Sequence, residues 1–139
     1  MGQYHKLVNL DKHEFVNPHR IGDGLKLWEM SASSYGIGSA LVILLAASNG
    51  RGGGDFNAPD KDGIIGRWAG DRIAFIGDYG EDNDLPAEFE AGTLYSKLEE
   101  NNSDWVDISE SLKPILQYEF GVSFKKTSYD YCQRSGGIQ

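Results

Sequence analysis

Cysteine is nearly absent from this chain, and no apolar run in it is long. The single thiol, Cys132, cannot form an internal bridge, which excludes the disulfide framework of a small secreted domain. The longest apolar run covers residues 40–47 and is far below the ~20 residues that span a bilayer. The first six residues contain no apolar signal core. The sequence therefore predicts a soluble, cytoplasmic protein without a membrane partner.

Basic residues are scarce in the second half of the chain. Residues 1–77 contain eight Lys and Arg and eight Asp and Glu, whereas residues 78–119 contain two and twelve, within a net charge of −8. A surface of that sign repels phosphate, so we expect no binding to the nucleic-acid backbone. The acidic segment 78–119 is either a solvated surface that keeps the protein soluble or a face that docks on a basic protein surface.

The N-terminal residues have the pattern of a β-hairpin. The segments 4–10 and 14–17 are strand-like and flank a turn-forming stretch, and Pro18 ends the second strand because it has no N–H for the ladder. Residues 25–30 are ambiguous between strand and helix. Residues 38–48 predict a helix that is apolar nearly all round and therefore buried, with both Leu44 and Leu45 in the core.

A second hairpin is predicted over residues 64–77, with strands at 64–68 and 72–77 around a glycine turn. The acidic stretch 78–90 has no regular period, which indicates a loop or a single helical turn. A short helix over 93–100, a brief strand at Trp105-Val106 and an amphipathic helix that ends at Gly121 should follow. Residues 122–127 and 129–131 look extended.

These elements fit one domain. A chain of 139 residues buries roughly two thirds of its unfolded surface, which is enough for a core without a disulfide or a structural metal. No internal repeat or linker interrupts it. We therefore predict a single α+β domain over residues 1–139, with a mostly antiparallel sheet built from hairpins, one buried helix and one or two amphipathic helices.

A glycine-rich loop directly follows the predicted buried helix. Four of the eighteen glycines surround Arg51 between positions 50 and 54. Because glycine has no Cβ, such a loop can turn several N–H groups and a guanidinium toward one anion. The alternative is a plain flexible connection between helix and hairpin. The candidate ligand-binding residues of this loop are Asn49, Arg51, Gly52, Gly53 and Asp55.

The segment 17–24 is a second shaped polar loop. It combines Pro18 with two glycines and a His-Arg pair. Arginine offers a fork that matches phosphate, and histidine is a donor whose charge switches near neutral pH. The candidate ligand-binding residues of this loop are His19, Arg20 and Asp23.

Known catalytic and metal motifs do not fit this sequence. A P-loop needs Gly-Lys before Ser or Thr, and the dinucleotide fingerprint needs a strand before its glycines, where a helix is expected here. A calcium loop centred on Gly63 would place alanines at its two essential carboxylate positions. There is no Gly-x-Ser-x-Gly segment, and the three histidines lack metal-site spacing. We therefore assign no catalytic residue, metal or cofactor.

Four segments stand out for comparison with other proteins: Met1-Gly2-Gln3-Tyr4, residues 18–27, residues 48–55 and residues 66–73. In these segments the chain resembles a group of small, uncharacterised bacterial and bacteriophage proteins. The resemblance covers about the first eighty residues and implies an origin in bacteria or their phages, but no activity. The acidic second half departs from that pattern.

Three hypotheses of function follow. The first is a small non-enzymatic binding module that holds a phosphorylated small molecule, such as a nucleotide, between the His19-Arg20 loop and the Arg51 loop. The second is an acidic inhibitor or adaptor whose 78–119 face docks on a basic protein surface, a counter-defence role typical of phage proteins. The third is a hydrolase or transferase with an N-terminal histidine, and it is the weakest because no partner for the base can be named.

Overall fold

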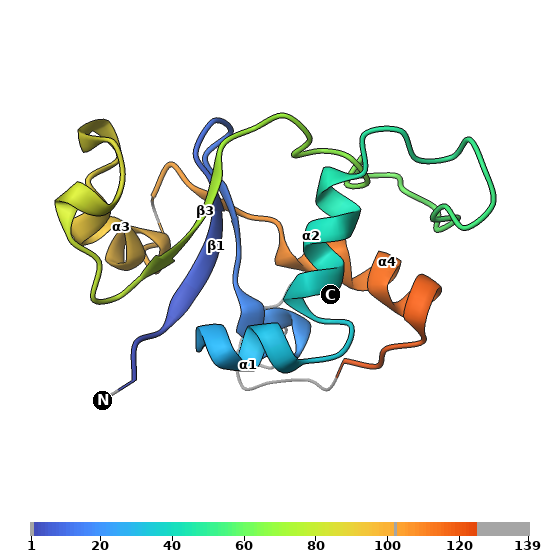
Figure 1. Ribbon diagram of the computed structural model, residues 1–139, viewed down its shortest axis with the longest axis horizontal. Coiled ribbons are helices and arrows are strands. Elements are labelled where there is room, and N and C mark those ends of the chain that lie inside the picture. The colour runs from blue at the N-terminus through green and yellow to red at the C-terminus, as the bar shows by residue number, and fades with distance from the viewer. Residues whose placement is uncertain (1, 102, 125–139) are drawn as a thin grey trace.

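A four-stranded sheet lies at the centre of the molecule, with helices on both of its faces (Figure 1). The computed structural model describes residues 2–101 and 103–124. The strands are β1 (His5–Asn9), β2 (Glu14–Val16), β3 (Ile73–Gly77) and β4 (Val106–Asp107). The α-helices are α1 (Leu27–Ala32), α2 (Ile37–Leu45), α3 (Ala91–Leu98) and α4 (Ser109–Phe120), and the 3-10 helices are η1 (Pro18–Ile21), η2 (Asp82–Asp84) and η3 (Ala87–Phe89).

The α+β prediction is confirmed, with a mixed sheet. The strand order is β3-β1-β2-β4, and β1 pairs antiparallel with both β2 and β3. Strand β4 pairs in parallel with β2, with Glu14 opposite Val106. The N-terminal hairpin is therefore confirmed, and so is a strand after Trp105. The parallel pair could not be read from short-range patterns, because parallel strands are joined by long connections.

The sheet separates two apolar cores. Alternate residues of β1 point to opposite faces, as the strand period of two requires. Leu7 packs with α2 and α4 in a cluster that contains Leu44 and Leu112, whereas Val8 packs with α3 in a cluster that contains Leu94. Strand β1 is consequently buried along its whole length.

The predicted second hairpin is wrong in its first strand. Residues 65–70 form successive turns, and only Ile73–Gly77 is a strand, paired with β1. The N–H groups of Gly66 and Trp68 instead donate to the carbonyls of Ile43 and Leu44, at 2.8 and 2.9 Å. These carbonyls belong to the last turn of α2, where the regular helical hydrogen bonds from residues four positions later are missing. Capping α2 thus uses the backbone groups that a strand would have needed.

Helix α2 is buried on one face only. Leu44 is fully buried as predicted, but Leu45 is 40% exposed and Val42 is 60% exposed, so the prediction of Leu45 in the core is wrong. The helix is also shorter than expected, since it ends at Leu45. An all-apolar helix does not reveal which of its faces meets the core, because every face has the same character.

The second half of the chain follows the predicted pattern closely. The acidic stretch forms only η2 and η3, the short helix is α3, and the amphipathic helix α4 ends where Gly121 takes a left-handed conformation with φ +70°. The ambiguous residues near position 27 begin helix α1. In the described part of the chain, no helix is long and apolar enough to cross a membrane. The predicted extended segments after Phe124, together with Cys132, lie outside the described residues.

Candidate ligand-binding site

The two predicted binding loops lie at opposite ends of helix α2 (Figure 1). The carboxylate of Asp23, from the first loop, accepts the N–H of Ile37 at the start of the helix. The second loop begins at Asn49, beyond the end of the helix at Leu45. Nine helical residues separate the two loops by roughly 13 Å. The two loops therefore do not meet around one site, and a phosphorylated ligand held between them, as predicted, would have to span the length of α2.

The glycine-rich loop already surrounds an anion of its own. One carboxylate oxygen of Asp55 accepts the backbone N–H groups of Gly50, Arg51 and Gly52 at 2.9, 2.8 and 3.0 Å. The N–H bonds from Arg51, Gly52 and Gly50 hold the pKa of Asp55 below its ordinary value. Most of the N–H groups that we expected to bind an external anion thus bind Asp55, while the side chain of Arg51 is exposed.

The first loop is held together in the same way. Asn17 accepts the N–H of His19 at 3.1 Å, and Gly22 closes η1 in the left-handed conformation. The buried Asp23 accepts hydrogen bonds from the hydroxyl of Ser33 at 2.7 Å and from the N–H of Ile37 at 2.8 Å. Asp23 therefore fixes the start of α2.

Arg20 connects η1 to the beginning of α4. Its guanidinium lies 3.0 Å from the carboxylate of Asp107 and 3.1 Å from that of Glu110, and its side chain is 16% exposed. Asp107 also accepts the N–H of Ser109 at 2.9 Å, close to the first turn of α4. Arg20 is thus oriented from two directions, and one side of it borders a cleft.

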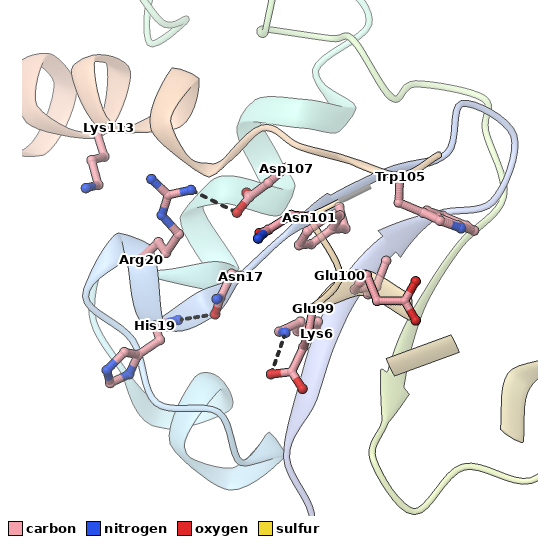
Figure 2. Close-up of a pocket in the computed structure, with 12 residues that line it drawn as sticks. Lys6, Asn17, His19, Arg20, Glu99, Glu100, Asn101, Trp105, Asp107 and Lys113 are labelled. Carbon is pink, nitrogen blue, oxygen red and sulfur yellow. Dashed lines mark hydrogen bonds and ion pairs between the residues drawn. The ribbon is translucent and has the colours of Figure 1, made fainter. Parts of the chain in front are cut away.

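This cleft, which we call the charged cleft, has a volume of about 480 Å³ and lies between α3 and η1 (Figure 2). It brings together residues from β1, β2, η1, the end of α3 and the chain that leads into α4. Its volume lies within the roughly 300–1,000 Å³ of small-molecule sites. The lining residues are Lys6, Phe15, Asn17, His19, Arg20, Leu98, Glu99, Glu100, Asn101, Trp105, Asp107 and Lys113.

Lys6 is a buried cation at the wall of the charged cleft. The residue is 4% exposed, its ammonium lies 3.4 Å from the carboxylate of Glu99, and it stands 4.4 Å above the ring of Tyr95. Burial raises the pKa of Tyr95 to about 12, and the negative charges of Glu99 and Asp78 act in the same direction. The ring therefore stays neutral beside Lys6, and Glu99 supplies the countercharge from a side chain that is 60% exposed.

Lys113 is the third cation of the charged cleft. It pairs with Glu110 at 2.8 Å one turn earlier in α4, and its side chain is 17% exposed. Figure 2 shows Lys113 and Arg20 near Asp107 on one side of the cleft, and Lys6 with Glu99 on the other. The described residues contain no group of three or more His, Cys, Asp or Glu side chains placed to hold a metal ion.

Sequence reasoning found His19 and Arg20 of the charged cleft but missed Lys6 and Lys113. The alternation of residues along the first strand could have indicated Lys6. In a strand with a period of two, Lys6 shares a face with Val8 and Leu10. A lysine on such an apolar face is buried only together with a charged partner. Nothing local marks Lys113, because its place depends on how α4 packs beside η1. Comparison of the chain with protein families, curated proteins and solved structures found no match.

Proposed function

We propose that the protein is a small binding module that holds a phosphorylated small molecule in the charged cleft. The buried ammonium of Lys6 is the observation that carries this proposal. Lysine is almost never fully buried without a charged partner, and an ion pair with a largely exposed carboxylate contributes little. Glu99 is such a partner, since it is 60% exposed. A phosphate in the cleft would be a stronger charged partner for Lys6 than Glu99 is.

Two further features support an anionic ligand. Arg20 and Lys113 add positive charge to the same cleft, and arginine provides the planar fork that matches phosphate oxygens. Both Glu99 and Glu110 are more than half exposed, at 60% and 51% of their side chains. They can rotate into water when a ligand replaces them, whereas the buried Lys6 cannot leave.

We expect Lys6→Met to weaken the binding of a phosphorylated ligand about ten- to a hundredfold, because it removes a charge-assisted contact of roughly 1.5–3 kcal/mol. Methionine keeps the apolar stem, and the exposed Glu99 stays hydrated after its partner is lost. Calorimetry with nucleotides and sugar phosphates would measure the affinities. Glu99→Gln should act in the opposite direction and strengthen binding, because it removes a competing carboxylate.

Arg51→Ala is the matched control for this experiment. The sequence predicts that Arg51 holds the ligand, whereas no residue of the Arg51 loop lines the charged cleft. Binding by Arg51→Ala should equal that of the parent protein. If Arg51→Ala loses binding while Lys6→Met keeps it, the ligand belongs to the glycine-rich loop, and if no phosphorylated compound binds at millimolar concentration, the proposal fails.

A second candidate function is docking on a basic protein surface through the acidic segment. A groove of about 540 Å³ lies beside α3 and receives the side chains of Glu88, Glu90, Glu100 and Asp104. Lys97 also lines it but is paired with Glu90 at 3.0 Å. This excess of carboxylates favours a lysine- or arginine-rich partner, since charge complementarity speeds encounter.

Charge reversal in this groove tests the docking function. Glu88→Lys and Asp104→Lys should slow association with a short lysine-rich peptide more than Asp62→Lys does, because Asp62 is an exposed carboxylate outside the groove. Association should also weaken steeply as the Debye length falls from about 10 Å at 0.1 M salt to about 3 Å at 1 M. Equal effects of the three reversals, measured by stopped flow, would mean that the acidic surface only keeps the protein soluble.

A further inference from the structure

The cations of the charged cleft form two separate groups. Figure 2 shows the Lys6–Glu99 pair on one side, and Arg20, Lys113 and Asp107 on the other. Different elements supply them, because Lys6 belongs to β1, whereas Arg20 belongs to η1 and Lys113 to α4. Arg20 and Lys113 share Glu110 as a partner, at 3.1 and 2.8 Å, whereas Lys6 pairs with Glu99 at 3.4 Å. Each group can therefore receive an anion of its own.

We infer that the ligand of the charged cleft carries two anionic groups, one for Lys6 and one for Arg20 and Lys113. This inference rests on the proposed function and names its ligand class. The volume of about 480 Å³ leaves room for a spacer between the two groups. Each group of cations also has an exposed carboxylate, Glu99 or Glu110, that a ligand anion can replace.

The residues between the two groups indicate the chemistry of the spacer. Asn17 and Asn101 line the charged cleft and lie between its two charged sides in the view of Figure 2. The carbonyl oxygen of Asn17 accepts the N–H of His19, and this bond fixes the orientation of its amide. Amides donate and accept hydrogen bonds and therefore match hydroxyl groups. The ligand class that fits is a sugar bisphosphate, with a phosphate at each end of a hydroxylated chain.

The test compares each bisphosphate with its own monophosphate. Calorimetry would use glycerate, pentose and hexose bisphosphates beside the corresponding monophosphates and inorganic phosphate. We expect at least one bisphosphate to bind about tenfold or more tightly than its monophosphate, because it makes a second charge-assisted contact. The spacer that binds best reports the separation of the two cation groups.

Variants at each group complete the test. Lys6→Met and Lys113→Met should each reduce bisphosphate affinity about tenfold or more, toward that of the monophosphate, and their effects should multiply in the double variant, as expected for separate contacts. Lys113→Met leaves the ion pairs of Arg20 with Asp107 and Glu110 in place, so the link between η1 and α4 survives. Melting curves would confirm that both variants fold, and Arg51→Ala should bind like the parent.

The outcomes separate this inference from the proposed function. If monophosphates bind as tightly as every bisphosphate, or if the double variant is no weaker than either single variant, the ligand has one anionic group. The inference then falls while the proposed function stands. If no phosphorylated compound binds, both fall.

Discussion

Leu44→Ala should lower the free energy of unfolding by about 2–5 kcal/mol, whereas Leu45→Ala should lower it by only about 1 kcal/mol. The two leucines are neighbours in α2, so the change in helix propensity is the same for both. Leu44 is fully buried between the sheet and α4, and its loss leaves a cavity, while Leu45 is 40% exposed. The difference between the variants therefore reports side-chain packing alone.

Urea denaturation followed by circular dichroism would measure both variants. Equal and large destabilisation would contradict the structure, because it would mean that the exposed face of α2 is covered in solution. That face also contains Val42, which is 60% exposed. A second copy of the chain would be the first explanation to examine, and the dependence of the melting temperature on protein concentration would test it.

Glu14→Leu should destabilise the protein by about 2–4 kcal/mol, because Glu14 is a buried carboxylate with two donors. It is 6% exposed and accepts hydrogen bonds from Arg67 at 2.9 Å and from the indole N–H of Trp68 at 2.8 Å. Leucine would leave the indole of the fully buried Trp68 without a partner. Arg67 is 36% exposed and can be rehydrated, which limits the loss.

Glu14→Gln should cost less, about 1–2 kcal/mol, because its amide oxygen still accepts from Trp68. Asp11→Asn is the control, since the Asp11–Arg72 pair joins the same two segments at the exposed surface. Exposed ion pairs contribute little, so this variant should unfold like the parent. If Asp11→Asn lowers the free energy of unfolding as much as Glu14→Leu does, the buried hydrogen bonds of Glu14 are not what holds Arg67 and Trp68 against the hairpin.

The pH dependence of stability provides a second test of Glu14. Burial acts to raise the pKa of Glu14, but hydrogen bonds from Arg67 and Trp68 and the charge of Arg67 outweigh it and hold the pKa below its ordinary value. Glu14 therefore binds a proton more readily in the unfolded chain than in the folded protein. The stabilisation is complete above about pH 4.5 and is lost as pH falls through the lowered pKa. The stability difference between parent and Glu14→Gln should accordingly shrink below about pH 4.

The charged cleft was only partly predictable. Pro18 and the glycines of residues 17–24 indicated a shaped loop, and the structure places His19 and Arg20 of that loop in the cleft. Asp23 and Asp55 lie in loops that have the composition of a binding site. Their carboxylates nevertheless accept hydrogen bonds from backbone N–H groups of the protein itself. A sequence shows that a carboxylate stands near several N–H groups, but it does not show that these groups satisfy each other.

Local pattern by itself determined the N-terminal hairpin, the short turns of the acidic segment and the end of α4 at Gly121, since each depends on the preferences of neighbouring residues. Only the tertiary structure decided that Gly66 and Trp68 cap α2, that β4 runs parallel to β2, and that Lys6 pairs with Glu99. Backbone groups and charges pair with whichever partner the fold brings near, and the partners of Lys6 and Glu14 are more than fifty residues away.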